Sequence, residues 1–592
     1  MKKKILILLT AVCGVILVPI ACKKSFLQTD NLNQLPRENI FNKPADGIAL
    51  VNSIYDTYQN ADLLKKSLWY YANFNTHDWF NWGNDRFYNY FDIQTNFAPM
   101  RVFWQRAYVG IARANTALEV IPEMRTKGVL DATLGDRLLG EAYFLRGLTY
   151  YYLGGSFGGV PLELQTVTEG LTPRASQDSV FKQVIEDMDK AAALLPFKDV
   201  YPTNEKGRAT KGAALAYAGA ARMWVKDYAG ALANFNQLEG KYSLLPNFID
   251  VNEYNKENND ESIFEIQFAV NGDQSWAAGN EVAWISDFSW PEEVSNFGYD
   301  YGNPGLYLSY QEGDKRKLAT IIGPGDSIIS PGIIGRGGIR SYPLVRSGYT
   351  LGQTPITSNM TEARKTEIMT AKRKYTGEDG NIINSVGTKS DPWYGSDGDG
   401  LRTGFYCAKM WRDPTLDANS GNSKIFGAQN QILMRYAEVL LSKAECQART
   451  GDVAGALATI KRVRDRAWGG SAPAVMQDGA KFDGTPAAPI TDPLQMVYSE
   501  YRHELSGEYS VFYLLRRAGV ASAFVNATYG AQPNNTNMIV NPAASMRAQD
   551  PDNGGKMHGL YNTAMTPNKE LYPIPELERG LNPNLTQNPG YQ

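Results

Sequence analysis

The sequence predicts a mainly α-helical protein, in which helix pairs form a scaffold that carries long irregular loop insertions and a few short β-strands. Three observations support this fold class. Apolar residues recur at helical spacing in several segments of the first half of the chain. Two distant stretches, 211–239 and 432–467, repeat one pattern of two small-residue-rich helices joined by a polar turn. Residues 245–431 and 469–491 are instead rich in Gly, Pro, Asn, Asp, Ser and Tyr, which favours loops.

Residues 1–21 form a targeting segment. Three lysines precede an apolar run over residues 5–18, which is shorter than the roughly 20 residues that a membrane-spanning helix needs. Ala21 is followed by Cys22, which resembles the lipobox of bacterial lipoproteins, although Pro19 replaces the usual Leu. This resemblance implies cleavage before Cys22 and lipidation of its thiol. The alternative is an ordinary secretory signal in which Cys22 falls by chance.

Composition limits the class of protein. The 592 residues carry a formal net charge of only −3, and no long basic run follows the N-terminus, so nucleic acid is not an expected partner. No later stretch reaches 18 apolar residues, so we expect no membrane-spanning helix after the targeting segment. Two cysteines remain beyond residue 22, Cys407 and Cys446. They could pair in an oxidising envelope or remain as buried free thiols.

An aromatic segment over residues 69–91 precedes the helices. Within it, "HDWFNWGNDRFYNYF" (77–91) has seven aromatic residues among fifteen, mixed with Asn, Asp, Gly and Arg. A core helix would not include so many polar groups, and a plain surface loop would not include so many rings. Aromatic rings can cover the C–H face of a sugar while polar side chains hydrogen-bond its hydroxyl edge.

Helical spacing identifies the elements that follow, within a helical region at 105–239. Residues 105–124 and 138–155 each place an apolar residue on one stripe every three or four positions. Residues 176–196 begin with capping residues and end at a proline. The two similar stretches at 211–239 and 432–467 each resemble a tetratricopeptide (TPR) helix pair, with a second helix that opens "AGAL". Because they lie far apart in the chain, they do not form a simple tandem array.

The loop-rich regions and the C-terminus complete the prediction. Residues 261–269 are rich in β-formers and predict a short strand, whereas 321–341 predict loops and short strands. Long irregular stretches in a compact protein are usually functional. The tail at 571–592 has four prolines, so we expect an extended strap over the helices with no helix of its own.

Several motifs together resemble the SusD/RagB family of surface nutrient-binding lipoproteins. They are "GEAYFLRGLTYYYLGGSFGGVPL" (140–162), the helices at 179–196, 207–225 and 434–467, and the "LYPIPELERGLNPNLTQNPGYQ" tail (571–592). They occur in family order over nearly the whole chain. The helix at 499–519 departs from the family pattern, because Tyr509, Val511 and Tyr513 replace the usual Gly, Arg and Asp. That departure concerns the packing of this helix.

The resemblance implies a function and a domain organisation. Family members capture an oligosaccharide, or a peptide in RagB-like proteins, and pass it to a SusC-like TonB-dependent transporter in the outer membrane. We therefore expect a lipid-anchored, surface-exposed outer-membrane protein with a transporter partner. The expected divisions are an N-terminal helical region (22–245), a loop-rich insertion region that carries the ligand-binding face (246–431), and a C-terminal region with TPR-like helices and the tail (432–592).

The sequence offers little support for the second alternative, an enzyme that acts on envelope glycans. "GGSFG" (154–158) fits a nucleophile-elbow pattern, but a predicted helix precedes it where that motif needs a strand. "HELSG" (503–507) lacks the second His of a zinc motif. The acidic loop at 391–400 lacks the spacing of a calcium-binding EF-hand. We expect no catalytic residue, no metal site and no cofactor.

The predicted ligand-binding residues come from two aromatic regions, the segment at 77–91 and a second one at 275–307. The resemblance implies that an early Asp/aromatic segment and long mid-chain loops form the site. The alternative for each ring is that it packs a loop onto the helices. The predicted residues are Asp78, Trp79, Trp82, Trp284, Trp290 and Tyr299.

Overall fold

The structure is a computed structural model of the full chain. It describes residues 40–81, 85, 87–88, 91, 93–166, 170–268, 289, 300–323, 326–331, 361–363, 365–366, 406–410, 429–478, 488–529 and 564–591. The predicted lipidation site Cys22 lies outside these residues. Within them, no helix is both long enough and apolar enough to cross a bilayer.

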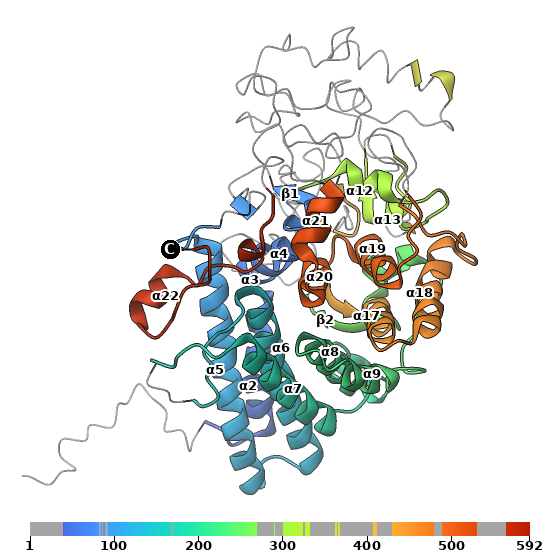
Figure 1. The fold of residues 1–592 in the computed structure, drawn as a ribbon. Helices are drawn as coiled ribbons and strands as arrows, with labels where there is room; N and C mark the ends of the chain where they lie inside the picture. The colour runs from blue at the N-terminus through green and yellow to red at the C-terminus, as the bar shows by residue number, and fades with distance from the viewer. Residues whose placement is uncertain are drawn as a thin grey trace, which may run out of the picture.

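Long antiparallel helices form the first half of the scaffold (Figure 1). They are α2 (Pro44–Asp56), α5 (Ala98–Thr126), α6 (Ala132–Phe157) and α7 (Gln177–Leu194). Side chains fix two of their starts: Asp131 Oδ1 accepts from Leu134 N at 2.8 Å, and Ser176 Oγ accepts from Ser179 N at 3.1 Å. Helix α7 packs on α6, and α6 packs on α5. The three helices predicted over 105–196 are therefore confirmed.

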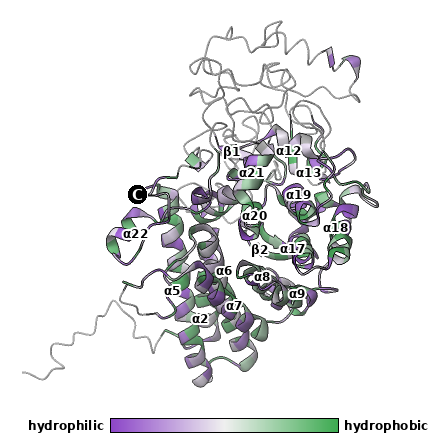
Figure 2. Ribbon diagram, in the orientation of Figure 1, coloured by the Kyte–Doolittle hydropathy of each residue, from purple (hydrophilic) through white to green (hydrophobic). Residues whose placement is uncertain are grey.

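The two TPR-like pairs are also confirmed, and they are neighbours. The first pair is α8 (Lys211–Trp224) with α9 (Tyr228–Asn236), and the second is α17 (Tyr436–Arg449) with α18 (Val453–Trp468). Helix α9 packs against α17, so segments about 200 residues apart lie side by side (Figure 1). Hydrophobic and hydrophilic residues share the same helices, as expected of elements with one buried face (Figure 2).

In the part of the chain that the structure describes, three sheets of two strands each lie among the helices. Strand β2 (Ser262–Ile266) confirms the strand predicted at 261–269 and pairs antiparallel with β6 (Gln431–Arg435). The prediction of helix from residue 432 was wrong over its first residues, because their backbone pairs with β2 and helix α17 begins only after Arg435. This pairing holds both ends of the region between the two strands. The other two pairs are β1 (Trp79–Asn81) with β3 (Asp300–Gly302), and β4 (Ile321–Ile322) with β5 (Tyr406–Cys407).

Short helical elements connect these parts of the fold. Between α2 and β1 the chain forms a 3-10 turn (Thr57–Gln59), α3 (Ala61–Leu63), a π-helix (Leu64–Trp69) and α4 (Tyr70–Phe74). After α7 it forms η6 (Lys198–Val200) and η7 (Thr203–Glu205), and after α9 it forms η8 (Phe248–Asn252) and η9 (Tyr254–Lys256). Helices α12 (Pro304–Ser309) and α13 (Lys317–Thr320) follow β3.

Helices α19 (Pro493–Leu505), α20 (Val511–Ala518) and α21 (Ala521–Tyr529) complete the core. The residues that depart from the family pattern are buried there. The Tyr513 hydroxyl lies 2.8 Å from Ser156 Oγ, and its ring packs against Gly155 so closely that an added Cβ would lie 2.7 Å from it. The large ring is therefore accommodated by a glycine in α6.

The tail crosses the scaffold as a strap, as predicted, but it does contain helical residues. After a 3-10 turn (Pro567–Lys569), a short helix, α22 (Glu576–Leu581), forms between Pro575 and Pro583, so the expectation of no helix was wrong. Six residues between prolines suffice for one turn, because Pro575 stands at the N-cap, where no N–H is required. Asn588 Nδ2 donates to the carbonyl oxygens of Phe157 and Tyr572, which ties the strap to the end of α6.

Cys407 and Cys446 are both buried free thiols, which matches the free-thiol alternative for this pair. Burial raises the pKa of Cys446 to about 12, so this thiol stays protonated at neutral pH.

Candidate functional site

The two predicted aromatic regions join the scaffold at one place. In the antiparallel pair β1–β3, Trp79 faces Gly302, Phe80 faces Tyr301 and Asn81 faces Asp300. The rest of the first aromatic segment follows Asn81, and the second aromatic region, residues 275–307, includes β3 itself. Asn81 Nδ2 donates to Asp300 Oδ1 at 2.8 Å, which locks this register. The sequence did not predict this pairing, because strands of three residues carry no readable pattern.

Asp78 and Trp79 lie inside the protein and not on a ligand-facing surface. Asp78 is 1% exposed and forms an ion pair with Arg502, whose Nη2 lies 2.9 Å from Asp78 Oδ1. Trp79 is 0% exposed, and its indole N–H donates to Ser506 Oγ at 2.9 Å. The positions of these two side chains therefore offer no direct ligand contact, because both are enclosed by α19 and the turn that follows it. For Trp79, the position agrees with the alternative given above, in which the ring packs its segment onto the helices.

The other predicted ligand-binding residues fall outside the described residues. These are Trp82, Trp284, Trp290 and Tyr299. Their role stays a prediction.

A buried lysine that the sequence did not predict, Lys65, forms an ion pair with Asp300 of strand β3. Lys65 is 0% exposed; its Nζ lies 2.5 Å from Ser289 Oγ and 2.9 Å from Asp300 Oδ2. The same ammonium lies 4.0 Å from the centre of the Trp69 ring. Lys65 belongs to the π-helix over Leu64–Trp69, and π-bulges often occur at functional sites. The available signal was a pair of lysines inside the apolar run "LLKKSLWYY".

A cavity of about 910 Å³ lies between the segment around η8, helices α12 and α13, and α18. It falls within the predicted insertion region except for one residue of α18, and its volume is within the range of ligand pockets. The Tyr307 hydroxyl donates to Asp326 Oδ1 at 3.2 Å, and Lys317 Nζ lies 3.8 Å from the centre of the Tyr307 ring. Rings and hydrogen-bonding groups therefore share its wall. Residues on the wall include Phe248, Tyr307, Tyr310, Gln311, Lys317, Asp326 and Arg466.

Two residues of the cavity wall, Asp314 and Arg466, belong to a buried ionic network. Glu504 accepts from Arg316, Arg435 and Arg466, and these arginines also pair with other buried acids. Burial alone would raise the pKa of Glu504, but the three arginines hold it well below its ordinary value. The network joins the insertion region to α18 and α19, and it comprises Glu261, Asp314, Arg316, Lys409, Arg435, Arg464, Arg466, Glu500, Glu504 and Glu508.

The enzyme-like motifs do not form catalytic arrangements. Ser156 of "GGSFG" is buried at the end of α6 against Tyr513. His503 of "HELSG" is 3% exposed, and its Nε2 lies 3.0 Å from Ser309 Oγ. Burial lowers the pKa of His503 to about 3, so this imidazole is neutral over the physiological range. Among the described residues, no group of three or more His, Cys, Asp or Glu side chains could hold a metal ion.

Two family models match the chain. The model described as "SusD family" covers residues 260–591, and one described as "Starch-binding associating with outer membrane" covers residues 26–224. Because the first match spans more than half of the sequence, the chain belongs to the SusD family. The second description associates such proteins with the outer membrane.

Known proteins with similar sequences and structures agree with this assignment. SusD-like protein P25 of Formosa agariphila is 25% identical over 391 residues, which are 65% of this chain and 64% of that protein. A SusD homologue of Bacteroides thetaiotaomicron is 20% identical, with a TM-score of 0.66 over 94% of this chain and 98% of that one. Surface glycan-binding protein A of the same species, solved with laminarihexaose, is 16% identical, with a TM-score of 0.64 over 92% and 99%. The chain thus spans somewhat less than two thirds of the curated relative and has a SusD-like fold.

Proposed function

We propose that this protein is a surface lipoprotein that captures an oligosaccharide and passes it to a SusC-like TonB-dependent outer-membrane transporter. The observation that carries the proposal is the β1–β3 pair, which attaches two aromatic-rich regions to the scaffold at facing residues. Loops held at their bases by a rigid scaffold are common binding sites. The glycan-bound relative has the same fold, which supports a glycan over other ligands.

The buried ion pairs around the β1–β3 pair favour ligand binding without a large rearrangement of the scaffold. Lys65, Asp78 and Arg502 are buried ions with short contacts, and separating any of them from its partner would leave an uncompensated charge. A rigid base reduces the entropy lost when a ligand is bound. We therefore propose that Asp78 and Trp79 position the site from inside, and that Trp82, Trp284, Trp290 and Tyr299 supply rings to the ligand.

The deciding experiment is calorimetric titration of the full chain in detergent with a panel of oligosaccharides, polysaccharides and mixed peptides. Trp82→Ala and Trp290→Ala should each weaken glycan binding about tenfold, the amount expected when one stacked ring is lost. Trp104→Phe is the matched control, because it keeps a buried ring in α5, has no part in the proposed site, and should leave the affinity unchanged. Unchanged binding in both alanine variants would move the site to the large cavity. Binding of peptides alone would favour a RagB-like peptide-binding protein.

Two further measurements test the remaining parts of the proposal. Cys22→Ser should abolish labelling with fatty acid, because the thiol is the acylated group. Gentle solubilisation of outer membranes should recover the protein with a large barrel partner, and recovery as a free monomer alone would contradict the partnership. New reducing ends after long incubation with the bound glycan would identify an enzyme instead.

A further inference from the structure

A second, smaller cavity lies on the scaffold, apart from the one described above. Its volume is about 320 Å³, and it shares no lining residue with the larger cavity. Three segments far apart in the sequence form it: the end of α2, the turn around η7, and the residues at the end of β2. This volume is at the lower limit of ligand pockets and is sufficient for one or two sugar rings.

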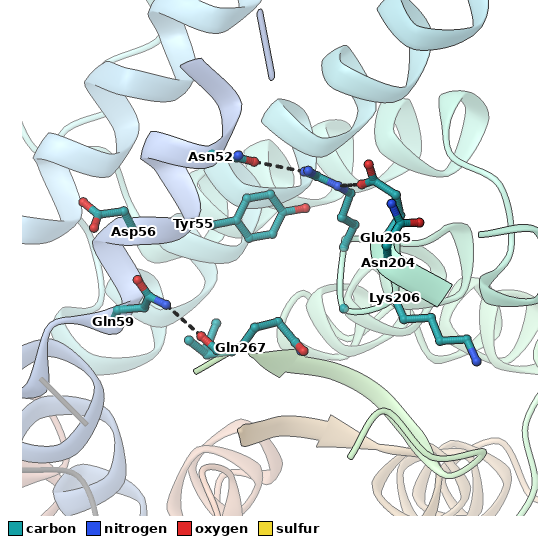
Figure 3. Close-up of a pocket in the computed structure, with 11 residues that line it drawn as sticks. Asn52, Tyr55, Asp56, Gln59, Asn204, Glu205, Lys206 and Gln267 are labelled. Atoms are coloured by element: carbon teal, nitrogen blue, oxygen red, sulfur yellow. Dashed lines mark hydrogen bonds and ion pairs between the residues drawn. The ribbon is translucent and has the colours of Figure 1, made fainter. Parts of the chain in front are cut away.

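The wall of this cavity is held firmly. The Tyr55 hydroxyl donates to the buried Glu141 at 2.9 Å and accepts from Ala209 N at 2.9 Å, which fixes the ring. Arg208 Nη1 donates to Asn52 Oδ1 at 3.1 Å and to Glu141 Oε2 at 3.0 Å. In Figure 3 the Tyr55 ring lies between Asn52 on one side and Gln59 and Gln267 on the other. The ring therefore occupies the middle of the cavity wall and is held by its own hydroxyl.

The opposite wall depends on a glycine. Gly207 has a φ of +99°, and an added Cβ there would lie 2.3 Å from Gln267. Gln267 is held in turn, since Gln59 Nε2 donates to its carbonyl oxygen at 2.7 Å and Asn430 Nδ2 donates to its Oε1 at 2.8 Å. The backbone therefore approaches closely at a position that a side chain could not occupy, and the cavity keeps its shape without a ligand.

The chemistry of the lining favours a neutral sugar. An aromatic ring and Ile266 provide apolar surface, while four amides, Asn52, Gln59, Asn204 and Gln267, provide donors and acceptors. The charged lining residues, Asp56, Glu205, Lys206 and Arg208, carry two charges of each sign and cancel. A net charge of zero gives no preference for an anion or a cation. A pyranose, with an apolar face and a hydroxyl edge, fits both parts of this lining.

We propose that this cavity, between α2, η7 and the end of β2, is a second binding site for one or two neutral pyranose units. It lies at the opposite end of β2 from the larger cavity, because Gln267 follows the strand and Arg466 pairs with Glu261 just before it. Five strand residues and their flanks span roughly 20 Å. A long glycan that occupies both this cavity and the main binding site of the proposed function would dissociate more slowly than one held at a single site.

Ligand-observed NMR on the full chain in detergent tests this proposal, with methyl glycosides of glucose, galactose, mannose and xylose as probes. The double variant Asn52→Ala/Asn204→Ala removes two exposed amides of the rim and should weaken binding of the preferred glycoside about tenfold. Asn236→Ala, an exposed amide on α9 outside both cavities, is the matched control and should have no effect. Tyr55→Phe keeps the ring and tests whether the fixed hydroxyl matters, with thermal unfolding as a check on folding.

The outcomes separate this proposal from the main one. Loss of glycoside binding in the rim variant, with long-glycan affinity still sensitive to Trp82→Ala, would support two sites. Equal binding by the wild type and the rim variant would overturn the second site, and so would the absence of any glycoside binding. Loss of glycoside binding only in the Trp82→Ala variant would overturn the second site while keeping the proposed function. Binding of short peptides in place of glycosides would overturn the ligand class.

Discussion

The two TPR-like helix pairs, α8–α9 and α17–α18, have the same type of turn between their helices but different surroundings. When the two stretches are aligned at Asp227 and Asp452, Gly219 corresponds to Ala444 and Ala213 to Glu438. Helix α8 buries a nearly continuous apolar surface against α7 and α9. Helices α17 and α18 instead bury Glu438, Arg464 and Arg466. The first pair is therefore held mainly by apolar packing with helices nearby in sequence, and the second also by ions whose partners come from distant segments.

The largest expected loss of stability comes from a substitution in the ionic network that holds the second helix pair. Glu504→Gln should lower the free energy of unfolding by about 4 kcal/mol, because it leaves Arg316, Arg435 and Arg466 buried with one fewer negative charge among them. Urea unfolding measures the change. Glu239→Gln is the control: its carboxylate also pairs with two cations, but its side chain is 37% exposed, so the loss should be below about 1 kcal/mol. Equal losses in the two variants would contradict the role of burial.

The second effect depends on pH. Burial raises the pKa of Glu438 to about 7 from 4.5, so the folded protein binds a proton more tightly than the unfolded chain. Stability from this group is full below pH 4.5 and declines as the pH rises to about 7. Glu438→Gln should therefore stabilise the protein at pH 8, by roughly 3 kcal/mol at most, and leave it nearly unchanged at pH 4. The test is thermal unfolding at both values, and a variant less stable at pH 8 would refute the prediction.

The third effect concerns the small residues. A Cβ on Gly219 would lie 2.4 Å from the Phe235 ring, so Gly219→Ala should cost about 1–2 kcal/mol despite the better helix propensity of alanine. The second pair has Ala444 and Ile460 at the corresponding positions, both buried. The double variant Gly219→Ala/Phe235→Ile copies that combination and should recover most of the loss. Denaturant midpoints decide the matter, and a double variant no better than the single one would show that the pairs pack differently.

The smallest effect should be equal in the two pairs. Asp227 accepts from Gly230 N, and Asp452 accepts from Gly455 N, each at 2.9 Å. Asp227→Ala and Asp452→Ala should therefore each cost about 1 kcal/mol, the usual value of an N-cap. Matched thermal unfolding curves measure both. A difference of more than about twofold would show that the turn is not equivalent in the two settings.

The contrast between local apolar packing and long-range ion pairs also explains which parts of the fold and site could be predicted from the sequence. Helices α5 to α9, α17 and α18 were predictable, because local periodicity determines which face is buried. Lys65, Arg316 and Arg435 were not, because a charged residue normally indicates the surface and their partners lie up to 235 positions away. For the proposed site, the sequence predicted two aromatic regions but not the β1–β3 pair that joins them. Asp78 was predicted to bind ligand, whereas the structure buries it against Arg502, a partner 424 positions away that no local pattern indicates.

The buried ionic network also sets an order on folding. Arg316 must meet Glu500, 184 positions later, and Arg435 must meet Glu261, 174 positions earlier. Contacts of such sequence separation form slowly, because the intervening chain must first be closed into a loop. Helices α5 to α9 can assemble as soon as they emerge during synthesis, whereas residues 261–435 can complete their ion pairs only after α19 has been made. Until then Arg316, Arg435 and Arg466 lack the carboxylate of Glu504 that they share in the folded protein, so the interior of the second half is completed only when α19 is in place.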